Sequence, residues 1–159
     1  MQPQQRILIV EDNLDNVSIY TAVLEFSGFE VLCAPDGVTG IKMAREQKPD
    51  LILMDVAIPG IDGWEATRTL KADAETWGIP IIVLTAHALE RDRLRAFSEG
   101  ADGYIAKPAD PTAVVRAIKR KLEDPDYPIG RSAIEAFTQG RAPSGPESSD
   151  GLGAEAAAP

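Results

Sequence analysis

Short aliphatic runs alternate along this chain with longer segments of helical periodicity, and no other feature of the sequence constrains the fold as strongly. The first run, at 7–10, is entirely aliphatic, which is typical of a strand covered on both faces of a sheet. Strand and helix patterns that alternate at this spacing form βαβ units. We therefore expect an α/β fold, (βα)5, with a doubly wound parallel five-stranded sheet. The expected strands lie at 7–10, 30–33, 50–54, 79–84 and 103–106, and the expected helices at 17–26, 38–47, 64–70, 89–99 and 111–122.

The composition of the chain changes after residue 123. The stretch from Asp124 to Pro128 carries two prolines that interrupt the last helix, and residues 142–159 are rich in Gly, Pro, Ser and Ala. Such a composition cannot bury enough apolar surface to fold. We expect a folded domain at 6–123 and a largely disordered tail at 124–159, with one short helical turn near 131–138. This tail is too short to form a second domain that binds DNA or catalyses an output reaction.

The net charge of the chain is -9, and its isoelectric point is about 4.6. An acidic protein repels the phosphates of nucleic acids, so we expect no nucleic-acid partner. The single cysteine, Cys33, lies in an apolar stretch, which excludes an intramolecular disulfide and predicts a buried structural thiol. No apolar run reaches the ~20 residues that a membrane helix needs. The polar N-terminus is unlike a signal peptide, so we expect a cytoplasmic protein.

Polar residues follow four of the expected strands, at the edge where an open parallel sheet binds its ligands. Glu11 and Asp12 follow the first strand, Asp55 the third, Thr85 the fourth and Lys107 the fifth. A lone acid after a strand is commonly only a helix cap, but acids at two strand ends with Thr and Lys at two others favour a ligand site. Three neighbouring carboxylates repel one another unless a cation joins them. Oxygen ligands without Cys or His suit Mg2+ better than zinc.

Four motifs at these strand ends resemble those of the receiver domains of bacterial two-component response regulators. The resemblance covers residues 6–123 and is nearest to stand-alone, single-domain receivers of the cell-division and chemotaxis kinds. It implies the flavodoxin-like receiver architecture and a role in phosphorelay signal transduction. The motifs are Ile9-Val10-Glu11-Asp12-Asn13, Leu53-Met54-Asp55-Val56-Ala57-Ile58-Pro59-Gly60-Ile61-Asp62-Gly63, Val83-Leu84-Thr85-Ala86 and Gly103-Tyr104-Ile105-Ala106-Lys107-Pro108.

The resemblance implies that Asp55 is the phosphoacceptor, whose carboxylate attacks a phosphoryl group on the histidine of a kinase or a histidine phosphotransfer protein. Glu11 and Asp12 would bind Mg2+ directly or through water. Asp55 and the backbone carbonyl of Ala57 would complete the protein ligands. Glu11 stands where the family more often has Asp, and its longer side chain still reaches a magnesium-bound water. Ala57, two residues beyond Asp55, would also modulate the lifetime of the phosphorylated state.

The same resemblance implies which residues act on the phosphoryl group and transmit the signal. Lys107 would neutralise one phosphoryl oxygen and Thr85 would hydrogen-bond another, with a cis peptide bond before Pro108. Phosphorylation would draw Thr85 toward the new charge, and Tyr104 would then rotate from an exposed to a buried position. His87, the lone histidine, would modulate the lifetime of the phosphorylated state at most.

Two surfaces are expected to bind other proteins. Family resemblance places the kinase on the first helix, at 14–24, with Tyr20 as a contact. A downstream partner would bind a face within 89–119, where phosphorylation changes the surface. Basic residues on the last two helices suit such a partner, although a basic helix face is more often simply solvated. They are Arg91, Arg93, Arg95, Arg116, Lys119, Arg120 and Lys121.

Other proteins of similar architecture fit the sequence less well. A flavin site needs a Ser, Thr or Gly-rich loop after the first strand, and a dinucleotide site needs a glycine fingerprint there; this chain has acids instead. An aspartate-nucleophile phosphatase would have Asp where Val10 precedes Asp12 by two residues. A receiver that works without phosphorylation should have lost an acid, the Thr or the Lys, and none is lost.

We therefore expect a phosphoacceptor that catalyses its own phosphotransfer and dephosphorylation, and not a turnover enzyme. Three outputs remain open at this point. The protein signals by contact with another protein, passes its phosphoryl group to a second histidine, or acts as a phosphate sink.

Overall fold

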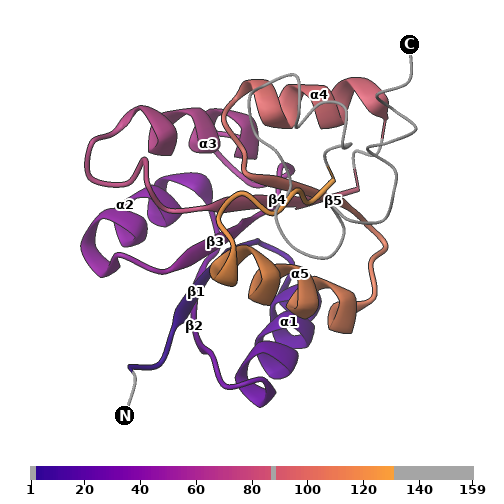
Figure 1. Ribbon diagram of the computed structural model, residues 1–159. Coiled ribbons are helices and arrows are strands. Elements are labelled where there is room, and N and C mark those ends of the chain that lie inside the picture. Colours follow the sequence, from indigo (N-terminus) through magenta and orange to yellow (C-terminus); the bar gives the residue numbers. More distant parts are fainter. Residues whose placement is uncertain (1–2, 87–88, 131–159) are drawn as a thin grey trace.

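The computed structural model describes residues 3–86 and 89–130 of the chain. Strands and helices alternate along these residues as the hydrophobic pattern predicted (Figure 1). The strands are β1 (Arg6–Val10), β2 (Glu30–Ala34), β3 (Leu51–Met54), β4 (Ile81–Thr85) and β5 (Gly103–Ala106). The helices are α1 (Leu14–Phe26), α2 (Gly37–Gln47), α3 (Gly63–Ala72), α4 (Glu90–Ser98) and α5 (Pro111–Glu123).

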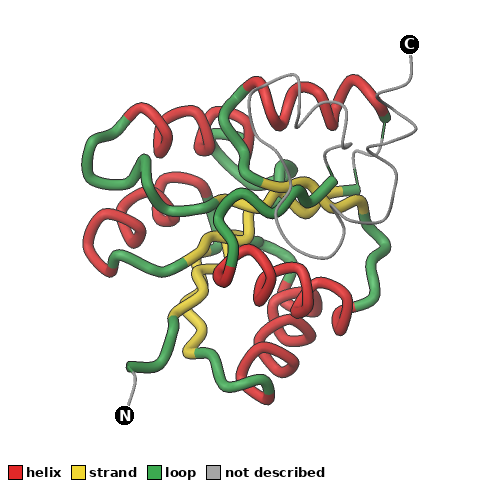
Figure 2. The backbone as a smooth tube through the Cα atoms, in the orientation of Figure 1, coloured by secondary structure: helices red, strands yellow, loops and turns green. Residues whose placement is uncertain are grey.

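The strands form one parallel sheet in the order β2-β1-β3-β4-β5. Helices α1 and α5 cover one face of this sheet, and α2, α3 and α4 cover the other (Figure 2). The chain reverses its winding direction after β2, so β1 and β3 become neighbours and their carboxyl ends meet at the same edge. This is the doubly wound (βα)5 fold expected from the sequence.

Alternation along each inner strand divides the core between the two faces of the sheet. In β1, Ile7 and Ile9 pack beneath α1 and α5, whereas Leu8 and Val10 pack beneath α2 and α3. None of these side chains is more than 1% exposed. The burial of both faces explains why the strand reads as a continuous aliphatic run, and it holds the residues that follow β1 in a fixed position.

The expected burial of Cys33 is wrong, because its side chain is exposed. Strand β2 is an edge strand, and α1 covers it only in part. The Cys33 sulfur lies 3.7 Å from the hydroxyl of Thr21 in α1. An aliphatic run predicts a strand, but it does not distinguish the centre of a sheet from its edge.

The packed part of the chain continues past the boundary expected at residue 123. Residues 124–130 follow α5, and within them Ile129 is only 7% exposed and joins the core on the α1 and α5 side. The helical turn expected near 131–138 and the rest of the tail lie outside the described residues. In the part of the chain that the structure describes, no helix is long and apolar enough to cross a membrane.

Candidate functional site

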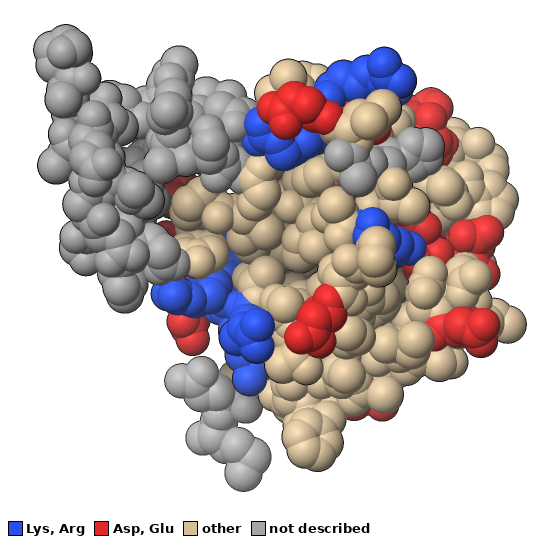
Figure 3. All heavy atoms as spheres, turned by 90° about the vertical axis from the view of Figure 1, so that its right-hand side faces the viewer, with Lys and Arg blue, Asp and Glu red and all other residues tan. Residues whose placement is uncertain are grey.

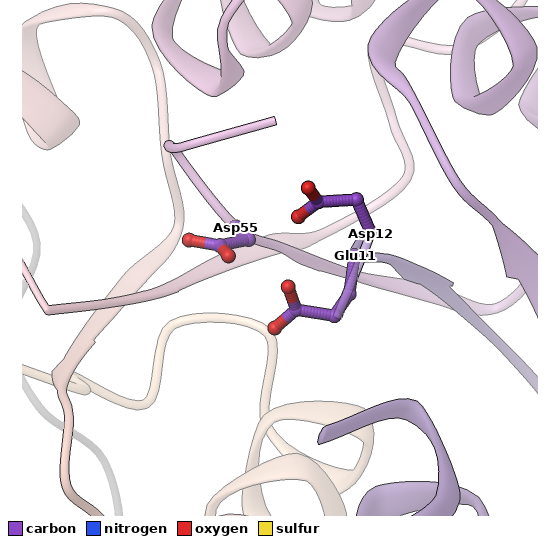
Figure 4. Close-up of side chains that lie close together, drawn as sticks. All are labelled: Glu11, Asp12 and Asp55. Atoms are coloured by element: carbon purple, nitrogen blue, oxygen red, sulfur yellow. The ribbon is translucent and has the colours of Figure 1, made fainter. Parts of the chain in front are cut away.

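Three carboxylates meet at the carboxyl end of the sheet (Figure 4). Glu11 and Asp12 directly follow β1, and Asp55 directly follows β3, the neighbouring strand. One carboxylate oxygen from each residue lies within 4.8 Å of the other two. The three side chains point toward a common space (Figure 4), so the sequence-predicted cluster forms in the folded chain.

The surrounding backbone orients two of these carboxylates. Glu11 and Asp55 are 6% and 8% exposed. The Glu11 carboxylate accepts hydrogen bonds from the Asn13 backbone N–H and the Asn16 side-chain amide, both at 3.2 Å. Asp55 accepts one from the Ala57 backbone N–H at 3.3 Å. The contact from Asn16 was not foreseen, because helical periodicity gave no sign that the first turn of α1 reaches back to Glu11.

Lys107 brings the one basic group into this cluster of described residues. Its ammonium lies 2.8 Å from a Glu11 oxygen and 3.4 Å from an Asp55 oxygen, and the bond to Pro108 is cis, as expected. Partial burial disfavours the charged ammonium, but the hydrogen bond to Glu11 and the charges of Asp55 and Glu11 outweigh it. They raise the pKa of Lys107 above its ordinary value. Lys107 is therefore a fixed cation at neutral pH.

Thr85 and Tyr104 lie in the adjacent strands. Thr85 ends β4 and is completely buried. Tyr104 in β5 pairs with Val83 of β4, and its side chain is 6% exposed in a cluster with Val56 and Trp64. The structure thus describes the buried position of Tyr104 and not the exposed one. His87 lies outside the described residues, so its modulatory role stays a prediction.

A glycine allows α3 to begin directly against the loop that carries Asp55. The Gly63 N–H donates to the Val56 carbonyl at 2.9 Å. A Cβ atom at Gly63 would lie 2.2 Å from the Asp55 carbonyl oxygen and 2.7 Å from the Val56 Cα. The sequence motif contained Gly63, but only the structure shows that the approach excludes a side chain.

We expect Gly63→Ala to lower the free energy of unfolding by about 1–3 kcal/mol or more, because α3 and the Asp55 loop must move apart. Urea denaturation measures this change. Gly78→Ala is the control, since a Cβ there would meet nothing within 4 Å, and its effect should stay within about 0.5 kcal/mol. Equal losses in the two variants would contradict the steric explanation.

A groove of about 460 Å³ lies beside Lys107 and is lined by residues of α1 and of the loop between β5 and α5. Ile19 and Tyr20 contribute from α1, but Tyr20 is only 6% exposed. The large apolar residues of α1 that are exposed are instead Leu14, Ile19 and Phe26, and of these only Ile19 lines the groove. Figure 3 shows the side of the molecule on which that loop lies, where uncharged residues occupy most of the centre.

A flavodoxin-like α/β protein with a candidate divalent-metal site at the carboxyl end of its sheet is the class that this fold and site define. The chain belongs to the response regulator receiver domain family, because the sequence model of that family matches residues 7–119. The family and the fold expected from the four sequence motifs are therefore confirmed. The chain is thus a receiver-domain response regulator of two-component signalling.

Relatives of this chain agree with that assignment. Protein PilH of Pseudomonas aeruginosa is 42% identical over 117 residues, which cover 74% of this chain and 97% of PilH. The polar-differentiation response regulator DivK of Brucella anthropi is 39% identical over 118 residues, covering 74% of this chain and 96% of DivK.

Solved structures share both the fold and part of the sequence. A CheY-like receiver domain from Methanospirillum hungatei has a TM-score of 0.72 and 30% identity, covering 77% of this chain and 96% of that structure. The receiver domain of a sensor histidine kinase from Pseudomonas aeruginosa has a TM-score of 0.71 and 37% identity, covering 77% and 100%. That second structure holds a magnesium ion coordinated in its active-site cleft.

Proposed function

We propose that this response regulator accepts a phosphoryl group on Asp55 with the help of Mg2+ and signals by phosphorylation-dependent contact with another protein. The donor is a histidine kinase or a histidine phosphotransfer protein. One observation carries the proposal: the Asp55 carboxylate shares its space with two further acids within 4.8 Å and with the Lys107 ammonium at 3.4 Å. Positive charge beside the acceptor, from Lys107 and from a metal ion that the three acids would hold, would stabilise the charged oxygens of an incoming phosphoryl group.

The donor set fits Mg2+, because it offers only oxygen ligands and groups them closely enough for one ion. Glu11, Asp12, Asp55 and the backbone carbonyl of Ala57 would hold the ion. When bound, Mg2+ supplies positive charge that stabilises the phosphoryl oxygens. Among the described residues, the nearest comparable charge from the protein itself is Lys107.

The chemical step needs no other nucleophile. An Asp55 carboxylate oxygen attacks the phosphorus, the bond between phosphorus and the donor histidine nitrogen breaks, and that nitrogen keeps the electron pair and takes up a proton. Lys107 neutralises one phosphoryl oxygen, and the hydroxyl of Thr85 hydrogen-bonds another. Water later hydrolyses the acyl phosphate, which releases inorganic phosphate and restores the Asp55 carboxylate. We interpret this cycle as the resetting of a switch and not as the turnover of a substrate. Ala57 and His87 would modulate that second step.

The groove beside Lys107 suits the kinase or phosphotransfer protein. Its lining includes Ile19, which is 48% exposed. An apolar partner surface would be buried there beside Lys107, whose ammonium lies 3.4 Å from an Asp55 oxygen. Tyr20 would contact this partner only through the part of its side chain that lines the groove, since the rest of that side chain is buried.

The downstream partner would bind the face within 89–119. Part of the basic surface expected there is already engaged by the protein itself. Arg93 pairs with Glu90, and the Arg95 guanidinium lies 5.1 Å from the centre of the Trp64 ring. Other basic residues on α4 and α5 are exposed; they are Arg91, Arg116 and Lys119.

The proposal is tested by incubating the full chain with acetyl phosphate and following its intact mass. With Mg2+ we expect the addition of one phosphoryl group, and with EDTA in place of Mg2+ we expect no addition, because the carboxylates then repel the incoming anion. A mass gain that is equally fast with EDTA would contradict the metal requirement. No gain under either condition would contradict the proposed function.

A further inference from the structure

The outer edge of β5 is covered by the chain itself. Strand β5 is the last strand of the sheet, so within residues 3–86 and 89–130 no further strand of the sheet pairs with its outward backbone groups. After α5 the chain turns and runs back alongside β5 (Figure 1), where Gly103 and Ile129 form a parallel bridge. The Tyr104 N–H donates to the Ile129 carbonyl at 3.0 Å. We refer to residues 124–130 as the C-terminal strap.

Two glycines shape the contact between β5 and the C-terminal strap. A Cβ atom at Gly103 would lie 3.0 Å from the Cβ of Ile129. Gly130 has a φ of +72, and a Cβ there would lie 2.1 Å from the Tyr104 carbonyl oxygen. The two backbones therefore approach more closely than side chains allow, and the left-handed conformation at Gly130 favours glycine for a second reason.

Cationic side chains of both neighbouring helices hold the C-terminal strap. Lys121 of α5, which is 3% exposed, donates to the Tyr127 carbonyl at 2.8 Å. The Arg120 guanidinium lies 4.9 Å from the centre of the Tyr127 ring. Arg93 of α4 donates to the Gly130 carbonyl at 3.0 Å. The C-terminal strap therefore joins α4, β5 and α5 across one face of the molecule.

Tyr104 connects this face with the proposed phosphoacceptor. Its backbone N–H donates a hydrogen bond to the Ile129 carbonyl of the C-terminal strap. Its side chain packs in the cluster that contains Val56, the residue after Asp55. Trp64 of α3 and Val83 of β4 belong to the same cluster. Tyr104 is already buried while the strap is closed, so its side chain does not need to rotate inward for the two sites to be coupled. A close-packed cluster has few alternative arrangements, so a phosphoryl group on Asp55 that displaces Val56 also displaces Tyr104, and the close backbone contact between Tyr104 and the strap does not tolerate that displacement.

The contacts that hold the C-terminal strap are local. They include hydrogen bonds from Tyr104, Lys121 and Arg93, the contact between Arg120 and the Tyr127 ring, and the burial of Ile129. These contacts must offset the conformational entropy lost by ordering every residue of the strap. Segments of this kind open at a lower free energy than the core strands and are the first to respond to a change at a neighbouring site.

We propose that the C-terminal strap closes the face formed by α4, β5 and α5 while Asp55 is unphosphorylated, and that phosphorylation of Asp55 loosens it. This inference rests on the proposed function, since it needs Asp55 as the acceptor. Loosening uncovers the outward edge of β5 and releases Arg93 and Lys121 from the strap carbonyls. The downstream partner then meets a face that this chain otherwise covers with its own residues.

The exchange rate of the Tyr104 amide hydrogen, measured by NMR on the full chain, reports directly on the C-terminal strap. Acetyl phosphate and Mg2+ should speed this exchange by about tenfold or more in phosphorylated protein, with phosphorylation followed by intact mass. A mass gain with unchanged or slower Tyr104 exchange overturns the proposed coupling alone. Absence of a mass gain overturns the proposed function, and the coupling with it.

A pair of glycine variants tests whether the C-terminal strap protects Tyr104 before phosphorylation. Gly130→Ala should speed Tyr104 exchange by about tenfold without acetyl phosphate, because the added methyl group meets the Tyr104 carbonyl. Gly28→Ala is the control, because Gly28 has a φ of +98 but nothing within 4 Å of its Cβ position. It should leave Tyr104 exchange at the wild-type rate. Wild-type exchange in Gly130→Ala, or equal acceleration in both variants, overturns the proposal.

Discussion

Asp55→Asn is expected to abolish phosphoryl incorporation from acetyl phosphate in the presence of Mg2+. The substitution keeps the size of the side chain and an oxygen that can accept from the Ala57 N–H. An amide, however, is not a nucleophile toward phosphorus and contributes no negative charge to a metal site. Intact mass spectrometry should show unmodified protein after the time at which the wild type is fully phosphorylated.

The matched control is Asp15→Asn, which removes the same charge from an exposed position in the first turn of α1. We expect it to become phosphorylated like the wild type. Asp55→Asn should also unfold at the same or a higher urea concentration than the wild type, because it removes one of three mutually repelling carboxylates. A phosphoryl gain in Asp55→Asn equal to that of the control would place the acceptor elsewhere.

Lys107→Met should separate the two proposed roles of the site, which are phosphoryl acceptance and Mg2+ binding. We expect phosphorylation to slow by about 100- to 1,000-fold, as when one preorganised donor to a developing charge is removed. Mg2+ affinity, measured by calorimetry, should stay the same or rise. The Lys107 ammonium occupies a Glu11 oxygen at 2.8 Å, and its removal frees that oxygen and takes away a neighbouring positive charge.

Lys42→Met provides the control for this prediction, since Lys42 is an exposed lysine of α2 outside the site. It should leave both the phosphorylation rate and the Mg2+ affinity unchanged. Weaker Mg2+ binding in Lys107→Met would mean that Lys107 orders the carboxylates rather than competing for them. An unchanged phosphorylation rate would remove Lys107 from the phosphoryl site.

The site was predictable from the sequence where strand ends determine position. Parallel strands that are covered on both faces have continuous aliphatic sequences. The residues that follow these strands can therefore be assigned to one edge of the sheet from the sequence alone. Glu11, Asp12, Asp55 and Lys107 meet there for that reason. The roles assigned to them came from family resemblance, because proximity alone does not say which carboxylate is the acceptor.

Other features depend on contacts that no local pattern encodes. Cys33 has the same aliphatic neighbours as a buried residue, but the position of β2 at the sheet edge exposes it. Ile129 lies among prolines and acids, without the apolar periodicity that would predict a packed segment. Its burial depends on Gly103, which lies far from it in the sequence. Asn16 and Gly63 likewise act through contacts with residues of other elements or loops.

The bond between Glu11 and Lys107 joins residues that are 96 positions apart in the sequence. During synthesis Glu11 and Asp12, which follow β1, leave the ribosome early, whereas Lys107 emerges only after β4 and α4. Contacts of such long range form late, since the intervening chain must first be ordered. A nascent chain therefore forms part of the sheet before the Lys107 ammonium can offset the negative charge of the carboxylates. We therefore expect a chain truncated before Lys107 to hold the proposed acceptor Asp55 without the cation that lies 3.4 Å from it.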